Sequence, residues 1–258
     1  MLEPQIELHP SERLDDLLTH DLHIIQSPEV FSFSMDAVLL ARFAHIPMRG
    51  RVLDLCSGNG VIPLLMSTRT KASIDAVELQ PRLADMARRS IELNGLQDRL
   101  TVYEGDLRTF HLSSGYGVYD AVTVNPPYMP AHTGDANANS HYAIARHEIH
   151  CTLEDVVTAC ARLVKSGGKV AMVHRPTRLI EIITYMKQVK LEPKRIRFVH
   201  PYQGSESNMV LIEAMRDAKP EVKILQPLIV YKENKQYHDE LMEIYYGSAN
   251  VGKKEVGE

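Results

Sequence analysis

The chain of 258 residues contains no tryptophan, and aromatic residues make up only 6% of it. It also lacks any uninterrupted apolar run near the roughly 20 residues that a membrane-spanning helix needs. The first residues, MLEPQIELHPSERLDD, are acidic and have neither the basic nor the apolar segment of a secretion signal. These absences argue against a membrane or secreted protein, so we expect a cytoplasmic one.

Cysteine is scarce, with single residues at Cys56, Cys151 and Cys160. They form no CxxC pair, and no histidine-rich pattern accompanies them. The spacing therefore predicts neither a disulfide framework nor a zinc site. We expect reduced, mostly buried thiols and no bound metal.

Neither sign of charge dominates the chain, whose formal net charge is −4. A nucleic acid would therefore need a local basic surface. Residues 165–197 contain nine Lys and Arg against two Asp and Glu. This region is either a nucleic-acid-binding surface, with Lys194, Arg195 and Arg197 as contacts, or an ordinary solvated helix face with its flanking loops.

The composition that remains is typical of a folded globular protein, with 44% apolar and 24% charged residues. Apolar, β-rich stretches alternate with amphipathic ones along the chain. Strands are expected at 52–55, 74–77, 100–103, 119–124 and 170–173, and helices at 61–68, 82–94, 153–164 and 178–189. This alternation predicts an α/β fold with a doubly wound, mostly parallel sheet.

Residues 194–199 and 208–213 resemble strands without a long helix between them, which predicts an antiparallel pair at the sheet edge and seven strands in all. We expect a core at 51–216. An N-terminal extension, 1–50, would end in a helix at 34–44 and pack over the cofactor pocket. A C-terminal extension, 217–258, would contain a strand-like segment at 227–231 and a Lys/Glu-rich tail that frays from about Gly247.

The loop Asp54–Gly60 follows the first core strand and opens the first core helix, as nucleotide-binding loops do. Glu78 and Asp106 end the next two strands, so all three acids should meet at the ligand-binding edge of the sheet. The loop lacks the GxGxxG spacing suited to phosphate and has Cys56 where a first glycine is expected. A tight turn without a ligand is the alternative.

A cationic ligand with an adenosine group and no phosphate fits these residues, as S-adenosylmethionine does, with S-adenosylhomocysteine as product. Glu78 would bind the ribose, Asp106 the adenine amino group, and the glycines would pass close to the amino-acid end. The predicted cofactor-binding residues are Asp54, Cys56, Ser57, Gly58, Asn59, Gly60, Glu78, Leu79, Asp106, Leu107 and Asn125.

The fourth strand runs directly into Asn125-Pro126-Pro127-Tyr128, which we predict to be the catalytic motif. Each proline holds the residue before it in extended geometry. A planar amine is a poor nucleophile because its lone pair is delocalised, and it needs acceptors for its hydrogens. The Asn125 side-chain oxygen and the Pro126 carbonyl can supply both, and Tyr128 offers a face for stacking. The alternative is that the motif only ends the strand and has no catalytic role.

The segment 129–150 is long and polar, which suits a mobile lid or a substrate-gripping loop. Arg146, His147 and His150 could contact phosphate there. The alternative is that His147 and Glu148 merely begin a helix.

With these motifs, the chain resembles the bacterial tRNA adenine-N6 methyltransferases that modify the adenine 3′ of the anticodon in a valine tRNA. The resemblance covers nearly the whole chain. It depends on the segments 33–40, 54–60, 125–128 and 145–148 and on His200-Pro201. It implies a Rossmann-like class I methyltransferase fold and an RNA substrate, with tRNA expected.

The resemblance also implies that Asp36 helps to close the cofactor pocket and that Phe31 or Phe33 shields the cofactor or the target base. Core packing of both aromatic rings is the alternative. Met35 departs from the threonine usual before this aspartate, and Cys56 departs from glycine. No RNA-binding domain is appended, so the basic region 165–197 would have to hold the RNA.

Relatives with the same motif methylate DNA adenine, ribosomal guanine or the glutamine of release factors. Protein-glutamine N5 and ribosomal guanine-N2 methylation therefore remain open. A third alternative is a non-catalytic scaffold that binds S-adenosylmethionine and RNA. A monomer and a homodimer are both compatible with the sequence.

Overall fold

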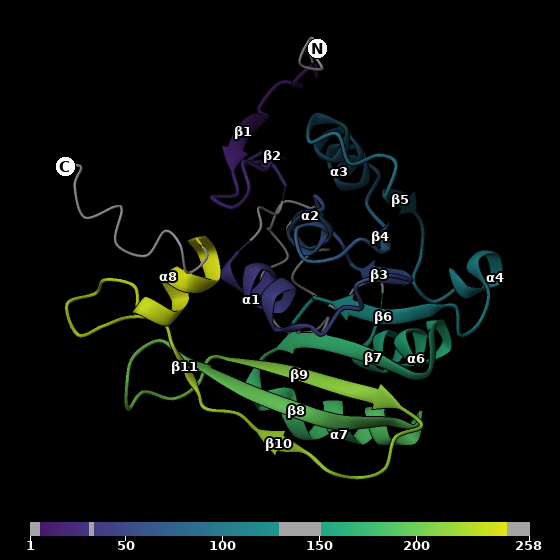
Figure 1. The fold of residues 1–258 in the computed structure, drawn as a ribbon, viewed down its shortest axis with the longest axis vertical. Coiled ribbons are helices and arrows are strands. Elements are labelled where there is room, and N and C mark those ends of the chain that lie inside the picture. Colours follow the sequence, from purple (N-terminus) through teal and green to yellow (C-terminus); the bar gives the residue numbers. More distant parts are fainter. Residues whose placement is uncertain (1–5, 31–33, 129–150, 247–258) are drawn as a thin grey trace, which may run out of the picture.

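A computed structural model describes residues 6–30, 34–128 and 151–246 of the chain (Figure 1). A twisted sheet runs through its centre in the order β10-β8-β9-β7-β6-β3-β4-β5, and β11 also pairs with β8. The strands of this sheet are β3 (Arg51–Leu55), β4 (Ser73–Glu78), β5 (Leu100–Glu104), β6 (Tyr119–Val124), β7 (Val164–His174), β8 (Leu191–His200), β9 (Met209–Arg216), β10 (Lys223–Ile224) and β11 (Leu228–Ile229).

Helices cover both faces of this sheet (Figure 1). The helices α1, α2 and α3 lie on one face, and α6 and α7 lie on the other. Two apolar clusters, one on each face, form most of the core. The helical elements are α1 (Met35–Phe43), α2 (Val61–Ser67), α3 (Pro81–Leu93), α4 (His111–Ser114), α6 (Leu153–Leu163), η1 (Pro176–Arg178), α7 (Leu179–Gln188) and α8 (Asp239–Tyr246).

The predicted doubly wound α/β fold is confirmed. The strands β3, β4, β5, β6 and β7 are mutually parallel, and β9 runs antiparallel to both β7 and β8. The predicted antiparallel edge pair is therefore β8 and β9. Seven strands are long, as predicted. Two short strands are added, β10, which the sequence pattern did not indicate, and β11, which lies within the strand-like segment predicted at 227–231.

Parallel strands buried on both faces require nearly continuous apolar sequence, which is why the predicted strands lie close to the observed ones. The β3 strand reads RVLDL and is buried from Val52 onward. At the start of α6, Thr152 and Asp155 exchange side-chain and backbone hydrogen bonds in a capping box. These local signals fix the ends of the elements that carry the site.

The N-terminal extension contains a hairpin that the sequence analysis did not predict, formed by β1 (Arg13–Asp16) and β2 (His23–Gln26). Helix α3 holds this hairpin through a bidentate ion pair between Arg89 and Glu12, with both N–O distances 2.7 Å. The Ile25 amide also donates to Ser90 Oγ. The predicted helix at 34–44 is present as α1, which packs in the core cluster with α2.

The C-terminal part differs from its prediction. The strand-like segment is β11, but the expected Lys/Glu-rich tail instead folds in part into α8, which buries Leu241. The proposed division at residues 50 and 216 remains a prediction. No helix in the described ranges is long and apolar enough to cross a membrane.

Candidate active site

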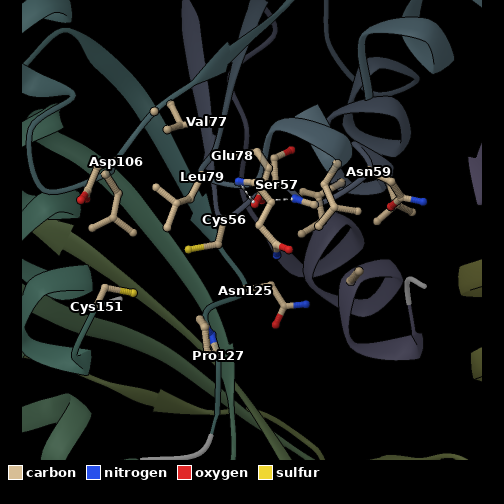
Figure 2. Close-up of a pocket in the computed structure, with 18 of the residues that line it drawn as sticks. Cys56, Ser57, Asn59, Val77, Glu78, Leu79, Asp106, Asn125, Pro127 and Cys151 are labelled. Carbon is tan, nitrogen blue, oxygen red and sulfur yellow. Dashed lines mark hydrogen bonds between the residues drawn. The ribbon is translucent and has the colours of Figure 1, made fainter. Parts of the chain in front are cut away.

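A pocket opens at the carboxyl ends of β3, β4 and β6, where the predicted ligand-binding edge lies (Figure 2). Its walls come from the loops after these strands and after β5, from α1, α2 and α3, and from Cys151, which precedes α6. The lining residues are Ser34, Ala37, Cys56, Ser57, Gly58, Asn59, Val61, Ile62, Val77, Glu78, Leu79, Gln80, Leu83, Gly105, Asp106, Leu107, Asn125, Pro127 and Cys151.

Three residues of the loop after β3 have left-handed backbone conformations. Gly58 and Gly60 have φ of 57° and 88°, and Cys56 has φ of 56°. A Cβ on Gly60 would lie 3.1 Å from the Ala87 side chain, so this glycine allows close packing against α3. A Cβ on Gly58 would meet no atom within 4 Å, because this glycine lines the pocket.

Cys56 thus adopts a left-handed conformation that glycine would take at little cost. For a residue with a Cβ, this conformation costs roughly 1–2 kcal/mol. Its thiol faces that of Cys151 across the pocket (Figure 2). A hydrogen bond with Cys151, together with burial, holds the pKa of Cys56 well above its ordinary value. Cys160 is buried as expected, whereas Cys56 and Cys151 are only half-buried.

Glu78 joins two backbone segments at the pocket floor. Its carboxylate oxygens accept from the Gly58 and Gln80 amides, at 2.8 and 2.9 Å. Its side chain is buried, and burial raises the pKa of Glu78 against the opposing hydrogen bonds. A carboxylate has about four acceptor positions, so it retains capacity for hydroxyl donors from a ligand.

Asp54 lies beneath the loop with no exposed surface. Thr123 donates to its Oδ1 at 2.6 Å, and burial raises the pKa of Asp54 to about 7. Asp54 Oδ2 and Ser57 Oγ are buried and form no well-aligned hydrogen bond among the described residues, although the nearby Ser57 hydroxyl favours the ionised form of Asp54 and so opposes the effect of burial on its pKa. Ser57 lines the pocket and Asp54 lies buried behind the lining, so this corner of the site is electronegative.

The opposite end of the pocket is more apolar. Leu79 is 39% exposed, and it lines the pocket. Leu107 lies nearby in the lining. Asp106 accepts the Arg108 amide at 2.8 Å and forms an ion pair with its guanidinium. A flat ring system could insert between the leucines with Asp106 at its edge.

Asn125 points into the pocket from the end of β6 (Figure 2). The Tyr128 hydroxyl lies 2.7 Å from Asn125 Oδ1 and 2.5 Å from Asp36 Oδ2, as a donor to either. Asp36 lies in the first turn of α1 and is buried. The side chain of Tyr128 thus connects the motif after β6 to α1.

Tyr128 also contacts the end of β7. Its ring packs against buried His174, with centroids 5.1 Å apart, and the Arg175 guanidinium lies over the ring at 5.5 Å. Burial lowers the pKa of His174 to about 4, so this histidine is neutral near pH 7. The Arg175 amide donates to its Nδ1, and its Nε2 has no partner among the described residues.

Most of the predicted cofactor-binding residues gather in the pocket. Asp36, Asp54, Gly60, Pro126 and Tyr128 do not line it and support it from behind. The sequence reasoning missed Gln80, Cys151 and His174. Phe31, Phe33, Arg146, His147 and His150, together with the predicted lid at 129–150, lie outside the described residues.

The missed residues had weak signals. Gln80 and His174 follow or end strands, and that position alone could have suggested them. Cys151 comes just before the capping box of α6, which marks a helix start but no ligand. In the described ranges, no group of three or more His, Cys, Asp or Glu side chains is arranged to hold a metal ion.

The basic region is largely paired within the chain. Arg195 forms an ion pair with Glu213, and Arg197 with Glu240. Lys194 donates to the Lys219 carbonyl. The side chains of Arg195 and Arg197 are only 22% and 19% exposed, which leaves little free charge for a phosphate. Their contact with RNA remains a prediction.

The fold and pocket define the class of the protein, a Rossmann-like methyltransferase. Among solved structures, a predicted O-methyltransferase of Agrobacterium tumefaciens superposes with a TM-score of 0.67 at 22% identity, over 83% of this chain and 96% of that one. Geranyl diphosphate C-methyltransferase of Streptomyces coelicolor, solved with S-adenosyl-L-homocysteine, has a TM-score of 0.51 at 14% identity, over 70% and 78%. These likenesses show the shared fold.

The sequence identifies the family. Residues 21–190 match the family described as "Methyltransferase small domain", and the chain belongs to it. A tRNA1(Val) (adenine(37)-N6)-methyltransferase of Aeromonas hydrophila subsp. hydrophila is 33% identical over 183 residues, 70% of this chain and 75% of the relative. One of Tolumonas auensis with the same name is 27% identical over 230 residues, 85% and 90%. The protein is therefore an S-adenosylmethionine-dependent methyltransferase.

Proposed function

We propose that the protein transfers the methyl group of S-adenosylmethionine to the exocyclic N6 amine of an adenine in RNA, with tRNA as the substrate. The observation that carries this proposal is the position of Asn125, whose side chain enters the pocket where β6 ends. The names of the relatives in Aeromonas and Tolumonas support the choice of tRNA and adenine.

The pocket fits S-adenosylmethionine at three places. The free acceptor positions of Glu78 suit the two ribose hydroxyls, and the exposed Leu79 suits an adenine face. Ser57 in the lining and Asp54 buried behind it form an electronegative corner suited to the cationic end. When bound, S-adenosylmethionine supplies an electrophilic methyl group, and S-adenosylhomocysteine is the product.

Asn125 and Pro126 would prepare the amine. The Asn125 Oδ1 atom has two lone pairs, so it can accept from the Tyr128 hydroxyl and from one amine hydrogen. The Pro126 carbonyl would accept the other hydrogen. With both hydrogens held, the nitrogen lone pair is directed out of conjugation and toward the methyl donor.

Tyr128 would act in two ways. Its hydroxyl lies between Asn125 Oδ1 and Asp36 Oδ2 and donates its one hydrogen to either of them, which positions the amide before substrate arrives. Its ring packs against His174 and lies under the Arg175 guanidinium, which fixes the orientation of the ring. A planar base would stack on the part of the ring that these two side chains leave free. No general base is required, because the methylated nitrogen loses its proton to water after transfer.

The test is to incubate the full chain with S-adenosylmethionine labelled in the methyl group and, in parallel, unmodified RNA, DNA and cell protein. Mass spectrometry of the labelled product decides the acceptor. We expect N6-methyladenine in the tRNA fraction. Label in N5-methylglutamine or N2-methylguanine would overturn the acceptor, and the absence of label in every fraction would favour a non-catalytic scaffold.

A further inference from the structure

Three tyrosines stack in a row at the far end of the sheet. Tyr202 follows β8, and Tyr231 and Tyr237 form the two sides of a hairpin after β11. The ring centroids of Tyr202 and Tyr231 lie 5.4 Å apart, and those of Tyr231 and Tyr237 lie 5.3 Å apart with planes only 19° from parallel. We call these residues the tyrosine ladder.

The tyrosine ladder lies at the same edge of the sheet as Asn125. The β8 strand is parallel to β7 and β6, because β9 runs antiparallel to both β8 and β7. The ends of β6, β7 and β8 therefore face the same side (Figure 1). Three steps across the sheet separate β6 from β8, which is about 15 Å at the usual strand spacing.

The backbone holds the ladder in place. The Tyr231 amide donates to the Pro201 carbonyl at 2.9 Å, and Tyr231 pairs with Tyr237 in an isolated β-bridge. The Tyr202 carbonyl accepts from the amide and the hydroxyl of Ser205 in a tight turn. The rings are thus ordered before any partner binds, which lowers the entropic cost of stacking on them.

The two end rings remain accessible. Tyr202 is 40% exposed and Tyr237 is 47% exposed. Nearby charges are mixed, since Lys232 pairs with Asp239 and Glu206 and Glu233 are exposed. Preformed aromatic faces in a nearly neutral setting suit the flat faces of unpaired bases better than a phosphate backbone.

We infer that the tyrosine ladder binds an unpaired base of the RNA substrate that flanks the target adenine. This inference rests on the RNA substrate proposed above. The register places Val124 level with Ile196, so Tyr202 lies beyond Asn125 along the strand direction as well as ~15 Å across the sheet. At about 3.4 Å per stacked nucleotide, the span is several nucleotides, a distance found within one RNA loop. The ladder would supply a contact with RNA that is independent of the predicted contacts of Arg195 and Arg197, whose charges are paired with Glu213 and Glu240.

The absence of tryptophan makes a direct test possible. In Y237W, the new indole becomes the sole tryptophan, and a base stacked on it should quench its fluorescence. The matched control is Y116W, because Tyr116 is 64% exposed but precedes β6 at the opposite edge of the sheet. The probes are an unmodified stem-loop RNA with an adenine in its loop and a blunt RNA duplex of the same composition.

We expect the stem-loop to quench Y237W and not Y116W, and the duplex to quench neither. In parallel, Y237A should raise the KM for the stem-loop roughly tenfold, within the range for loss of one stacked base, and Y237F should restore it. The salt dependence of binding should stay the same in Y237A, because no phosphate contact is removed. Calorimetric S-adenosylmethionine binding reports whether each variant is folded.

Absence of quenching in Y237W together with an unchanged KM in Y237A would overturn the ladder while leaving RNA methylation intact. A wild-type chain that labels protein and not RNA would overturn the proposed function. In that case the fluorescence of Y237W still tests the ladder separately. If no RNA changed this fluorescence, base binding by the ladder would be rejected as well.

Discussion

Asn125 carries the proposed chemistry at the scale of single residues. We predict that Asn125→Ala lowers kcat by about 100-fold or more, the usual effect of losing one such hydrogen bond in a transition state. The S-adenosylmethionine affinity should change by no more than about twofold, since Glu78 and the glycine loop are untouched. Single-turnover methyl transfer and calorimetry measure the two quantities. An equal loss of both would assign Asn125 to cofactor binding instead.

Gly58 offers a second test, because its backbone is left-handed and its missing side chain faces the pocket. Gly58→Ala should weaken S-adenosylmethionine binding by roughly tenfold, since the added methyl group occupies ligand space. Gly95→Ala is the matched control: φ is 64° there, a Cβ would also meet no atom within 4 Å, and the site is a turn after α3. Both variants should lose about 1 kcal/mol of stability.

Thermal melting and calorimetry separate these two effects. If Gly95→Ala weakened cofactor binding as much as Gly58→Ala does, backbone strain and not pocket space would explain the loss.

The sequence placed Glu78, Asp106 and Asn125 well, because a residue that ends a parallel strand must lie at the ligand-binding edge. It could not place the contact between Tyr128 and Asp36, which joins positions 92 residues apart. Nor could it show that Cys56 replaces glycine by adopting a positive φ, since that choice depends on the surrounding loop.

Among the elements, the N-terminal hairpin affects the site from outside it. Asn59 Nδ2 donates to the Ile25 carbonyl, so β2 is connected to the cofactor loop. The side chain of Glu12 has no exposed surface and that of Arg89 is 14% exposed. Losing the arginine would leave a buried carboxylate with His9, through its amide and its imidazole, as the remaining partner.

We predict that Arg89→Met undocks the hairpin, at a cost of about 3 kcal/mol. Hydrogen exchange should quicken at residues 13–26, and S-adenosylmethionine should bind several-fold more weakly. Arg88→Met is the control, because Arg88 is exposed on the same helix and, within the part of the chain that the structure describes, donates to the Val102 carbonyl of β5 and not to the hairpin. Equal protection of the hairpin in both variants would contradict a docking role for Arg89.

The alternating strands and helices of the core were predictable because their apolar patterns are local. The hairpin was not, since β1 and β2 have four residues each and are fixed by contacts with α3 some 65 to 82 residues away. Helix α8 was also missed, because only Leu241 is buried in it and the rest resembles a charged tail.

For the molecule as a whole, Asp54 makes stability depend on pH. Burial raises the pKa of Asp54 to about 7 from an ordinary value of 3.8, so the folded state favours the protonated form. The stabilisation is complete below pH 3.8 and is lost as the pH rises through about 7.

We predict that, as the pH rises from 3.8 to about 7, the free energy of unfolding of the wild type falls more than that of Asp54→Asn. The difference between the two proteins should reach up to about 4 kcal/mol. The asparagine can still accept from Thr123 and cannot ionise. Urea unfolding at a series of pH values measures the difference. Parallel curves for the two proteins would mean that another group, such as buried Glu78, dominates the dependence.

The same carboxyl group couples cofactor binding to proton release. A cationic ligand above Asp54 favours its ionised form and lowers its pKa, so binding near pH 6 should release up to about one proton. Calorimetry in two buffers with different ionisation enthalpies counts that proton. S-adenosylhomocysteine has the same amino-acid end but no sulfonium charge, so it should release fewer protons, and Asp54→Asn should release fewest with either ligand. If Asp54→Asn released as many protons as the wild type, the released proton would come from another group, such as Glu78, and not from Asp54.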